Sequence, residues 1–455
     1  MNPLQGRVEA KDIPVVINRD LDLLFVIDDS PSMADKQANL AANFPQFMKV
    51  LSSIPGGLPN VHIGVVTSDL GTQGAGDTNP SFGPGIGQIG MGGCFGVGKD
   101  GNLQLFGAAG AVGGDLFISN IADPVTGARM PNYTPNTEAR LEEIFGQMAH
   151  AGAGGCGFEQ HLEAIRHALQ PSNAVNQIAD EDDCSLQHYS MLGPENATLG
   201  PQQSFRCTRF GVTCNQNGQS SDAMNQVGPK GQCHPNDGSA YLTKVGEYVA
   251  FLKGLKSSPR KVIVAGIVGD PDPVATELRA PPPGTGTKIP ALAHSCTYNG
   301  AGGTEVGDPA VRIKFFLDQF PNRSTFSTIC QRDLSGGLQQ IGDLLKTVIG
   351  DPCIEGKLAD VDPKTPGPQY ECAVSYIKNP DDPAPQEFIM PKCTPEDATA
   401  TNQPCWHLAP DAVNCATAPT QLSGDKLVLK IEGQNELKTQ GTDVHVLANC
   451  VTQAQ

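Results

Sequence analysis

Short apolar runs alternate along the chain with segments that carry an apolar residue every three or four positions. Residues 23–27 are apolar without interruption, which is typical of a parallel strand buried on both faces. Residues 261–268 contain a second run of this kind, and residues 60–69, rich in Val and Ile, indicate another strand. These runs predict the strands of a buried sheet.

Apolar stripes at helical spacing predict the helices between these strands. Strands and helices in this order favour an α/β fold with a doubly wound, mostly parallel sheet over residues 21–350. Residues 1–20 precede it as a lead-in strand or arm. The predicted helices include residues 40–51, 137–149, 156–169, 241–255, 311–320 and 336–349.

Two stretches interrupt the pattern and are expected to be long loop insertions. Residues 71–114 are rich in Gly, and residues 185–240 are rich in Gly, Gln, Ser and Asn. Beyond residue 350 the composition changes again, with six cysteines and many prolines. Alternating patterns at 426–432 and 443–448 predict half-buried strands there. Residues 351–455 are therefore predicted to form a small, cysteine-rich β module held by up to three bridges, or a β extension packed on the first domain.

Composition limits the function of this 455-residue chain. Gly (52) and Pro (37) are abundant and aromatic residues make up only 5%, which favours long loops around a modest core. The net charge of −17 excludes nucleic acid and anionic membranes as expected partners, because both require clustered Lys and Arg. No window is apolar enough to predict a transmembrane segment.

The fourteen cysteines are scattered and even in number, and they form no paired Cys-x-x-Cys modules. On an acidic, loop-rich chain this pattern predicts disulfides formed in an oxidising compartment. We therefore expect an extracellular, cell-surface or periplasmic protein. Residues 1–20 contain no visible signal peptide, so the sequence does not indicate how the chain is exported.

The most informative chemistry follows the first apolar run. Asp28 comes directly after the predicted strand, and Ser30 and Ser32 follow at alternate positions before an amphipathic helix. Ligands of open α/β sheets bind beyond the carboxyl ends of the strands. A carboxylate and two hydroxyls in that place form an all-oxygen site for a hard cation, Mg²⁺ or Mn²⁺.

This Asp-x-Ser-x-Ser motif resembles the metal-ion-dependent adhesion site (MIDAS) of von Willebrand factor type A (VWA) domains. The runs at residues 154–160 and 180–185 resemble a cysteine-rich, exported bacterial branch of VWA proteins, common in myxobacteria, many of which look like surface lipoproteins. The resemblance covers roughly residues 5–350, with a looser match beyond. It implies cation-dependent adhesion to a protein or surface polymer that presents a carboxylate.

VWA domains complete their site with a Thr from a second loop, and here the match is broken. Residues 151–156 contain no hydroxyl, and Cys156 lies close to the Thr position. Because a thiolate is too soft for Mg²⁺, we expect Cys156 to form a disulfide, with Cys94 as the candidate partner. Water or Glu159 is left to fill the metal's shell. Alternatively, Glu159 is a helix N-terminal carboxylate favoured by the helix dipole.

The third loop of the family contributes an Asp, which by motif is Asp180. The segment before it, residues 173–179, has only two large apolar residues and predicts a poor central strand. Either residues 175–179 form a short strand, or the sheet is rebuilt and Asp180 lies in a loop. Asp270, after the strong strand at 261–268, is the alternative third carboxylate.

The acidic run at residues 180–183 has two interpretations of its own. It is a candidate Ca²⁺ site through several carboxylates, or a solvated acidic turn fixed by Cys184.

The chain shows no motif of an enzyme. It contains no His-Glu-x-x-His pattern, no Gly-x-Ser-x-Gly elbow and no Walker loop. We therefore expect a binding protein rather than a catalyst. The competing hypothesis is a degenerate VWA scaffold without metal that serves as a structural component of the cell envelope or surface.

Overall fold

The computed structural model divides the chain into two compact units. Residues 21–48 and 60–341 form the first, called here the α/β unit, and residues 1–20, 49–59 and 342–455 form the second, the β unit. The structure describes residues 7–14, 19–73, 85–169, 175–256, 258–281, 284–300, 303–380, 384–394, 404–416, 418–433, 437 and 444–453.

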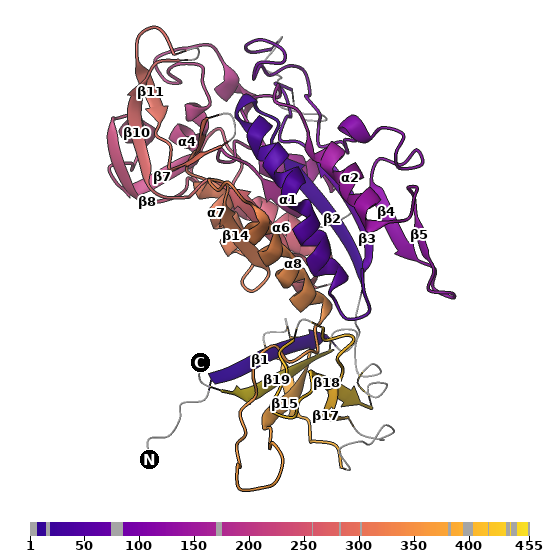
Figure 1. Ribbon diagram of the computed structural model, residues 1–455. Helices are drawn as coiled ribbons and strands as arrows, with labels where there is room; N and C mark the ends of the chain where they lie inside the picture. The colour runs from indigo at the N-terminus through magenta and orange to yellow at the C-terminus, as the bar shows by residue number, and fades with distance from the viewer. Residues whose placement is uncertain are drawn as a thin grey trace. The chain divides into compact units, whose positions relative to one another are not determined.

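A seven-stranded sheet lies at the centre of the α/β unit, in the order β14-β9-β6-β2-β3-β4-β5 (Figure 1). The neighbours β14, β9, β6 and β2 are parallel, whereas β4 is antiparallel to both β3 and β5. The predicted α/β class is thus observed, although several small antiparallel sheets accompany this one. The seven strands are β2 (Asp20–Ile27), β3 (Asn60–Val66), β4 (Ile118–Ala122), β5 (Arg129–Pro131), β6 (Val175–Ile178), β9 (Val264–Val268) and β14 (Ser324–Thr328).

Helices cover both faces of this sheet. Phe25 of β2 packs edge-on against Phe44 and Phe145, with ring centroids 6.2 and 4.7 Å away. Its neighbours Leu24 and Val26 belong to a core on the opposite face, with residues of α3, α6 and α7. Successive strand residues point to opposite faces, so a continuous apolar run is what this strand requires. The helices are α1 (Ala34–Ser52), α2 (Glu138–Ala149), α3 (His161–Ala168), α6 (Val245–Gly254), α7 (Val311–Asp318) and α8 (Ser335–Ile349).

The helix boundaries agree with the sequence where a cap is present and differ where a loop intervenes. Thr137 caps α2 by accepting a hydrogen bond from Arg140 N. The third helix begins at His161 and not at Cys156, because the residues before it form a loop. Similarly, α6 begins at Val245, later than predicted.

The second predicted insertion is more ordered than the sequence indicates. Residues 185–240 contain a 3-10 turn, two short helices and a hairpin, so regular elements interrupt the loop in this insertion. Alternating apolar residues are too sparse there to reveal strands, and the Cys214–Cys233 disulfide joins the hairpin instead. The hairpin strands join a four-stranded antiparallel sheet in the order β11-β10-β8-β7. The elements are η3 (Tyr189–Leu192), α4 (Phe205–Gly211), β7 (Val212–Gln216), α5 (Ser221–Met224), β8 (Gly228–Pro235), β10 (Val274–Arg279) and β11 (Ile289–Leu292).

The first insertion has little regular structure in its described part, residues 71–73 and 85–114. It contains an isolated bridge between Ile86 and Cys94 and the 3-10 turn η2 (Phe106–Ala108). Residues 74–84 of this insertion lie outside the described residues. A separate hairpin, β12 (Cys296–Asn299) and β13 (Thr304–Gly307), follows β11.

The β unit contains a four-stranded sheet in the order β1-β19-β15-β16 and a two-stranded sheet, β17-β18. Trp406, Leu429 and Val446 belong to its buried core. The lead-in segment pairs along β1 with β19 and is therefore part of this sheet. The strands are β1 (Arg7–Pro14), β15 (Cys372–Lys378), β16 (Gln386–Ile389), β17 (Cys405–Pro410), β18 (Leu427–Glu432) and β19 (Val444–Thr452).

All fourteen cysteines are paired, which confirms the prediction of disulfides. Three bridges lie in the β unit. Within the described part of the chain, no helix combines the length and apolar character needed to cross a bilayer. The bridges are Cys94–Cys156, Cys184–Cys207, Cys214–Cys233, Cys296–Cys330, Cys353–Cys415, Cys372–Cys450 and Cys393–Cys405.

The aromatic cluster around Phe25 gives a test of this core. Phe25→Ala should lower the free energy of unfolding by about 3–5 kcal/mol, because it leaves a cavity in a fully buried cluster. The side chain of Phe315 on α7 is 37% exposed, so Phe315→Ala should lower the free energy of unfolding by about 1 kcal/mol at most. Urea unfolding followed by circular dichroism compares the two, and equal losses would contradict the assigned core.

Candidate functional site

The carboxylate of Asp28 is fully buried at the end of β2. Its Oδ1 accepts a hydrogen bond from Ser30 N at 2.8 Å, and its Oδ2 accepts one from Ser30 Oγ at 3.2 Å. The hydroxyl oxygens of Ser30 and Ser32 lie 3.2 Å apart. Ser30 is buried, whereas Ser32 is exposed to solvent. The three residues of the motif thus converge, and the group opens to solvent at Ser32.

A third hydroxyl, which the sequence analysis missed, comes from the next strand. Ser68 follows β3 and donates to Asp28 Oδ1 at 3.2 Å. β3 neighbours β2 in the sheet, so their carboxyl ends supply the same site. The Thr-Ser-Asp sequence at the end of the predicted strand at 60–69 was the available signal. Ser68 supplies a hydroxyl to the site where the second loop has none.

Gln37 in α1 connects the strand end to the second loop. It is buried, and its Nε2 donates to Asp28 O at 2.8 Å and to Gly152 O at 2.7 Å. Its Oε1 accepts from Gly152 N. Gly155 N donates to Asp29 O at 2.7 Å. A Cβ at Gly155 would lie 2.4 Å from the Asp29 carboxylate, so only glycine permits this approach.

The predicted bridge between Cys94 and Cys156 is present. It holds the described end of the first insertion against the second loop, where Gly157 N donates to Gly92 O at 3.0 Å. The sulfur of Cys156 is therefore no thiolate ligand. The same insertion provides Lys99, which forms an ion pair with the buried carboxylate of Asp29.

Glu159 lies just before α3, whose N-cap is Gln160. The side chain is buried, and its Oε1 has no hydrogen-bond partner among the described residues. Burial, followed by the charges of Glu181 and Asp28, raises the pKa of Glu159 well above its ordinary value. The burial, the unpartnered oxygen and the raised pKa associate Glu159 with the other buried carboxylates. A carboxylate that only stabilised the helix N-terminus would not need to be buried.

Asp180 follows β6, the short central strand. β6 is parallel to β2 on one side and to β9 on the other, so the short-strand alternative is the observed one. The Asp180 side chain is 2% exposed. Its Oδ1 has no hydrogen-bond partner in the described structure, and its Oδ2 lies 2.9 Å from Lys36 Nζ. Asp270 follows β9, one strand farther from β2, and is half-buried.

Lys36 is the cation of this site, and the sequence analysis missed it. Its side chain is 1% exposed, and its Nζ also donates to Ser32 O at 2.9 Å and to Glu305 Oε2 at 3.3 Å. Burial acts to lower the pKa of Lys36, but the charges of Asp180 and Glu305 outweigh it and raise that pKa. The signal was its position four residues after Ser32, one helical turn away.

Two carboxylates of the acidic run, Asp182 and Asp183, bind the first turns of neighbouring helices. The carboxylate of Asp182 accepts from the backbone N–H groups of Arg312 and Ile313 at the start of α7. Asp183 accepts from Leu162 N at 2.9 Å near the start of α3, and it forms a buried ion pair with Arg312 at 3.0 Å. These two carboxylates thus satisfy helix N-termini. Calcium binding to residues 180–183 stays a prediction.

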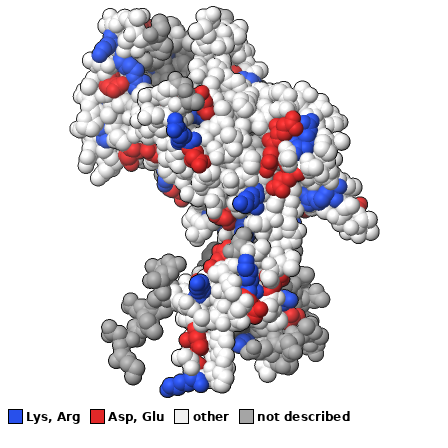
Figure 2. All heavy atoms as spheres, in the orientation of Figure 1, with Lys and Arg blue, Asp and Glu red and all other residues white. Residues whose placement is uncertain are grey.

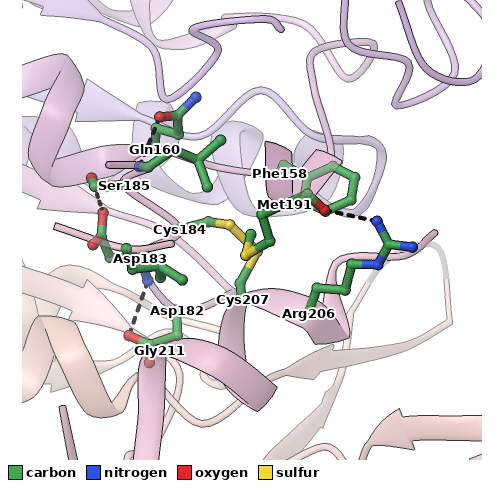
Figure 3. The surroundings of a disulfide bond; sticks show 12 residues. Phe158, Gln160, Asp182, Asp183, Cys184, Ser185, Met191, Arg206, Cys207 and Gly211 are labelled. Carbon is green, nitrogen blue, oxygen red and sulfur yellow. Dashed lines mark hydrogen bonds between the residues drawn. A yellow bond between two sulfur atoms is a disulfide. The ribbon is translucent and has the colours of Figure 1, made fainter. Parts of the chain in front are cut away.

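A disulfide secures this run beside the second insertion (Figure 3). Cys184 is bonded to Cys207, and Asp183 accepts from the Ser185 hydroxyl at 2.6 Å. Arg206 is buried next to the bridge and donates to Met191 O at 2.7 Å. The disulfide therefore fixes the loop that follows Asp180.

Burial and mutual repulsion dominate the electrostatics. The pKa of Asp28 is raised well above its ordinary value by burial and then by the charge of Asp180. Burial, with the charges of Asp308 and Asp180, raises the pKa of Glu181 to about 8. Such a cluster of carboxylates binds a cation favourably, because a cation offsets both effects.

The donor set fits a small, hard cation. It consists of carboxylate and hydroxyl oxygens, and two buried carboxylate oxygens, Glu159 Oε1 and Asp180 Oδ1, lack hydrogen-bond partners in the described structure. Among the described residues, no group of three or more His, Cys, Asp or Glu side chains is arranged to hold a metal ion. The carboxylates of Asp28, Glu159 and Asp180 alone therefore do not form such a group.

Comparison with known proteins adds little to this geometry. No family model and no curated protein matches the sequence. Among solved structures, one match is described as "von Willebrand factor type A from Catenulispora acidiphila", at 8% identity and a TM-score of 0.27. The match covers 100% of this chain and 66% of that one, so the chain spans slightly less than two thirds of that protein's length. The description of the fold rests on the strand order and pairing.

The ion pair between Arg312 and Asp183 tests how the acidic run is held. Arg312→Met should lower the free energy of unfolding by about 3–5 kcal/mol, because it leaves a buried carboxylate without its partner. Lys314→Met removes an exposed partner of Asp318 on the same helix and should cost about 0–1 kcal/mol. Denaturant unfolding measures both, and a small effect of Arg312→Met would refute the structural role.

Proposed function

We propose that the α/β unit is a VWA-type binding module that holds Mg²⁺ or Mn²⁺ through Asp28, Ser30, Ser32 and Asp180. The convergence of Asp28 and Asp180 from adjacent parallel strands carries this proposal. The Ser30 and Ser32 hydroxyls, 3.2 Å apart, add the neutral oxygens that such an ion accepts. Glu159 is available as a further ligand, directly or through water.

The chemistry of this ligand set explains a binding function. Two of the proposed ligands are neutral hydroxyls, and a carboxylate that contacts the ion only through water leaves it part of its positive charge. Mg²⁺ retains water readily, and a carboxylate from a partner can replace one water molecule. The exposed Ser32 marks the side from which the partner approaches. The exchange of water for a carboxylate is then the adhesion event.

The surroundings of Ser32 favour a protein partner. The first insertion passes beside Pro31, since a Cβ at Gly92 would lie 3.2 Å from Pro31 Cγ. Ile89 and Met91 near that point are 75% and 69% exposed. A partner segment with an apolar side chain next to its carboxylate suits this surface. On the face drawn in Figure 2, Lys and Arg are scattered among acidic residues.

Seven disulfides are compatible with an extracellular protein. The proposed location is the cell surface, the periplasm or the secreted space, and lipid attachment belongs to the same proposal. In that setting a cation-dependent module serves adhesion rather than catalysis.

A second candidate function is a VWA-like scaffold that binds no metal and serves in the cell envelope. The ion pair of Lys36 with Asp180 favours it, because the ammonium group already compensates one of the buried carboxylates. Metal binding separates the two candidates.

Calorimetric titration of the oxidised protein with Mg²⁺ and Mn²⁺ tests the proposal. The parent should show saturable binding, which Asp28→Ala should abolish because it removes a proposed ligand, the buried carboxylate that accepts hydrogen bonds from Ser30 N and from the Ser30 hydroxyl. Asp318→Ala, on the surface of α7, is the control and should bind as the parent does. Circular dichroism should show that both variants are folded. Binding that survives Asp28→Ala would place the ion elsewhere.

The third carboxylate is tested by a matched pair of variants. Asp180→Asn should weaken Mg²⁺ binding by about tenfold or more, because the charge of the ligands sets the affinity of such sites. Asp270→Asn should leave the affinity unchanged, since Asp270 follows a strand farther from Asp28. The reverse ranking would assign the role to Asp270.

A further inference from the structure

The ammonium group of Lys36 lies between the two segments that form the proposed cation site. It is 2.9 Å from Asp180 Oδ2 on one side and 2.9 Å from the backbone oxygen of Ser32 on the other. Glu305 of β13 makes a third contact, at 3.3 Å. Because the side chain is 1% exposed, solvent screens these interactions very little.

The positive charge of the Lys36 ammonium group opposes the binding of a cation beside it. A divalent ion bound to Asp28 and Asp180 would lie within a few ångströms of Lys36 Nζ, and like charges at that distance repel strongly in a buried setting. The ion and the ammonium group also need the same carboxylate. Lys36 is partnered by Asp180, Glu305 and Ser32, so its contact with Asp180 is one of several and can be given up.

We propose that Lys36 is a built-in competitor of the divalent cation: when the ion binds to Asp180, the ammonium group of Lys36 gives up its contact with that carboxylate. This inference deepens the proposed function and rests on it. The site then fills only at a cation concentration high enough to displace the ammonium group. Without the divalent ion, Lys36 compensates Asp180 and keeps the loops after β2 and β6 together.

The affinity of variants tests the competition. Lys36→Met keeps the length of the side chain and removes its charge, so Mg²⁺ should bind about tenfold or more tightly by calorimetry. Lys36→Arg keeps the charge and should not gain affinity. Lys346→Met is the matched control, because it removes a buried lysine from an ion pair with Asp351 in the β unit. Its Mg²⁺ affinity should equal that of the parent.

A second measurement uses the unaltered protein and does not depend on how the variants fold. Acetylation of lysines by acetic anhydride, mapped by mass spectrometry, should leave the buried Lys36 protected without divalent cation. Saturating Mg²⁺ should increase its labelling, while labelling of Lys346 should not change. Constant protection of Lys36 at saturation would overturn the release from Asp180.

The outcomes separate this inference from the proposed function. Equal Asp28-dependent binding by the parent and Lys36→Met would refute the competition and leave the metal site intact. Binding by Lys36→Met alone would support the competition and explain a silent parent. Binding by neither, with both proteins folded, would refute the competition together with the metal site.

Discussion

The burial of several carboxylates at one edge of the sheet is the constraint on which the α/β unit depends. Asp28, Glu159 and Asp180 are all removed from water close to one another, and each desolvated charge is costly unless it is compensated. A sheet edge that served only stability would contain apolar or neutral residues here. This cost supports the proposal that these carboxylates hold a cation.

The rest of the unit holds this cluster in place. Gln37 joins the end of β2 to the second loop, and the Cys94–Cys156 bridge fastens that loop to the first insertion. On the other side, Arg312 and the Cys184–Cys207 bridge fix the residues that follow Asp180. The insertions thus have a structural task at the site, and in the second insertion the disulfide adds to a buried apolar cluster that includes Tyr189, Leu192 and Phe210.

The sequence predicts the elements whose signal is local. The apolar run before Asp28 reveals a strand buried on both faces, and the spacing of Ser30 and Ser32 reveals the hydroxyl pair. It does not reveal Ser68, Lys36 or Glu305, because their roles depend on which strands and hairpins become neighbours in the fold. The hairpin within residues 185–240 was missed because its strands have no alternating apolar pattern. A disulfide joins them instead.

The shortness of β6 shows how the fold tolerates a weak local signal. The strand lies between β2 and β9, so its backbone groups pair on both sides, which only a central position provides. After the strand ends, Ala179 N donates to Ile267 O, and Asp180 O accepts from Asp308 N at 2.7 Å. These hydrogen bonds continue the backbone pairing beyond the end of β6 as far as Asp180. The position of Asp180 is therefore set by its neighbours and not by the apolar content of its own segment.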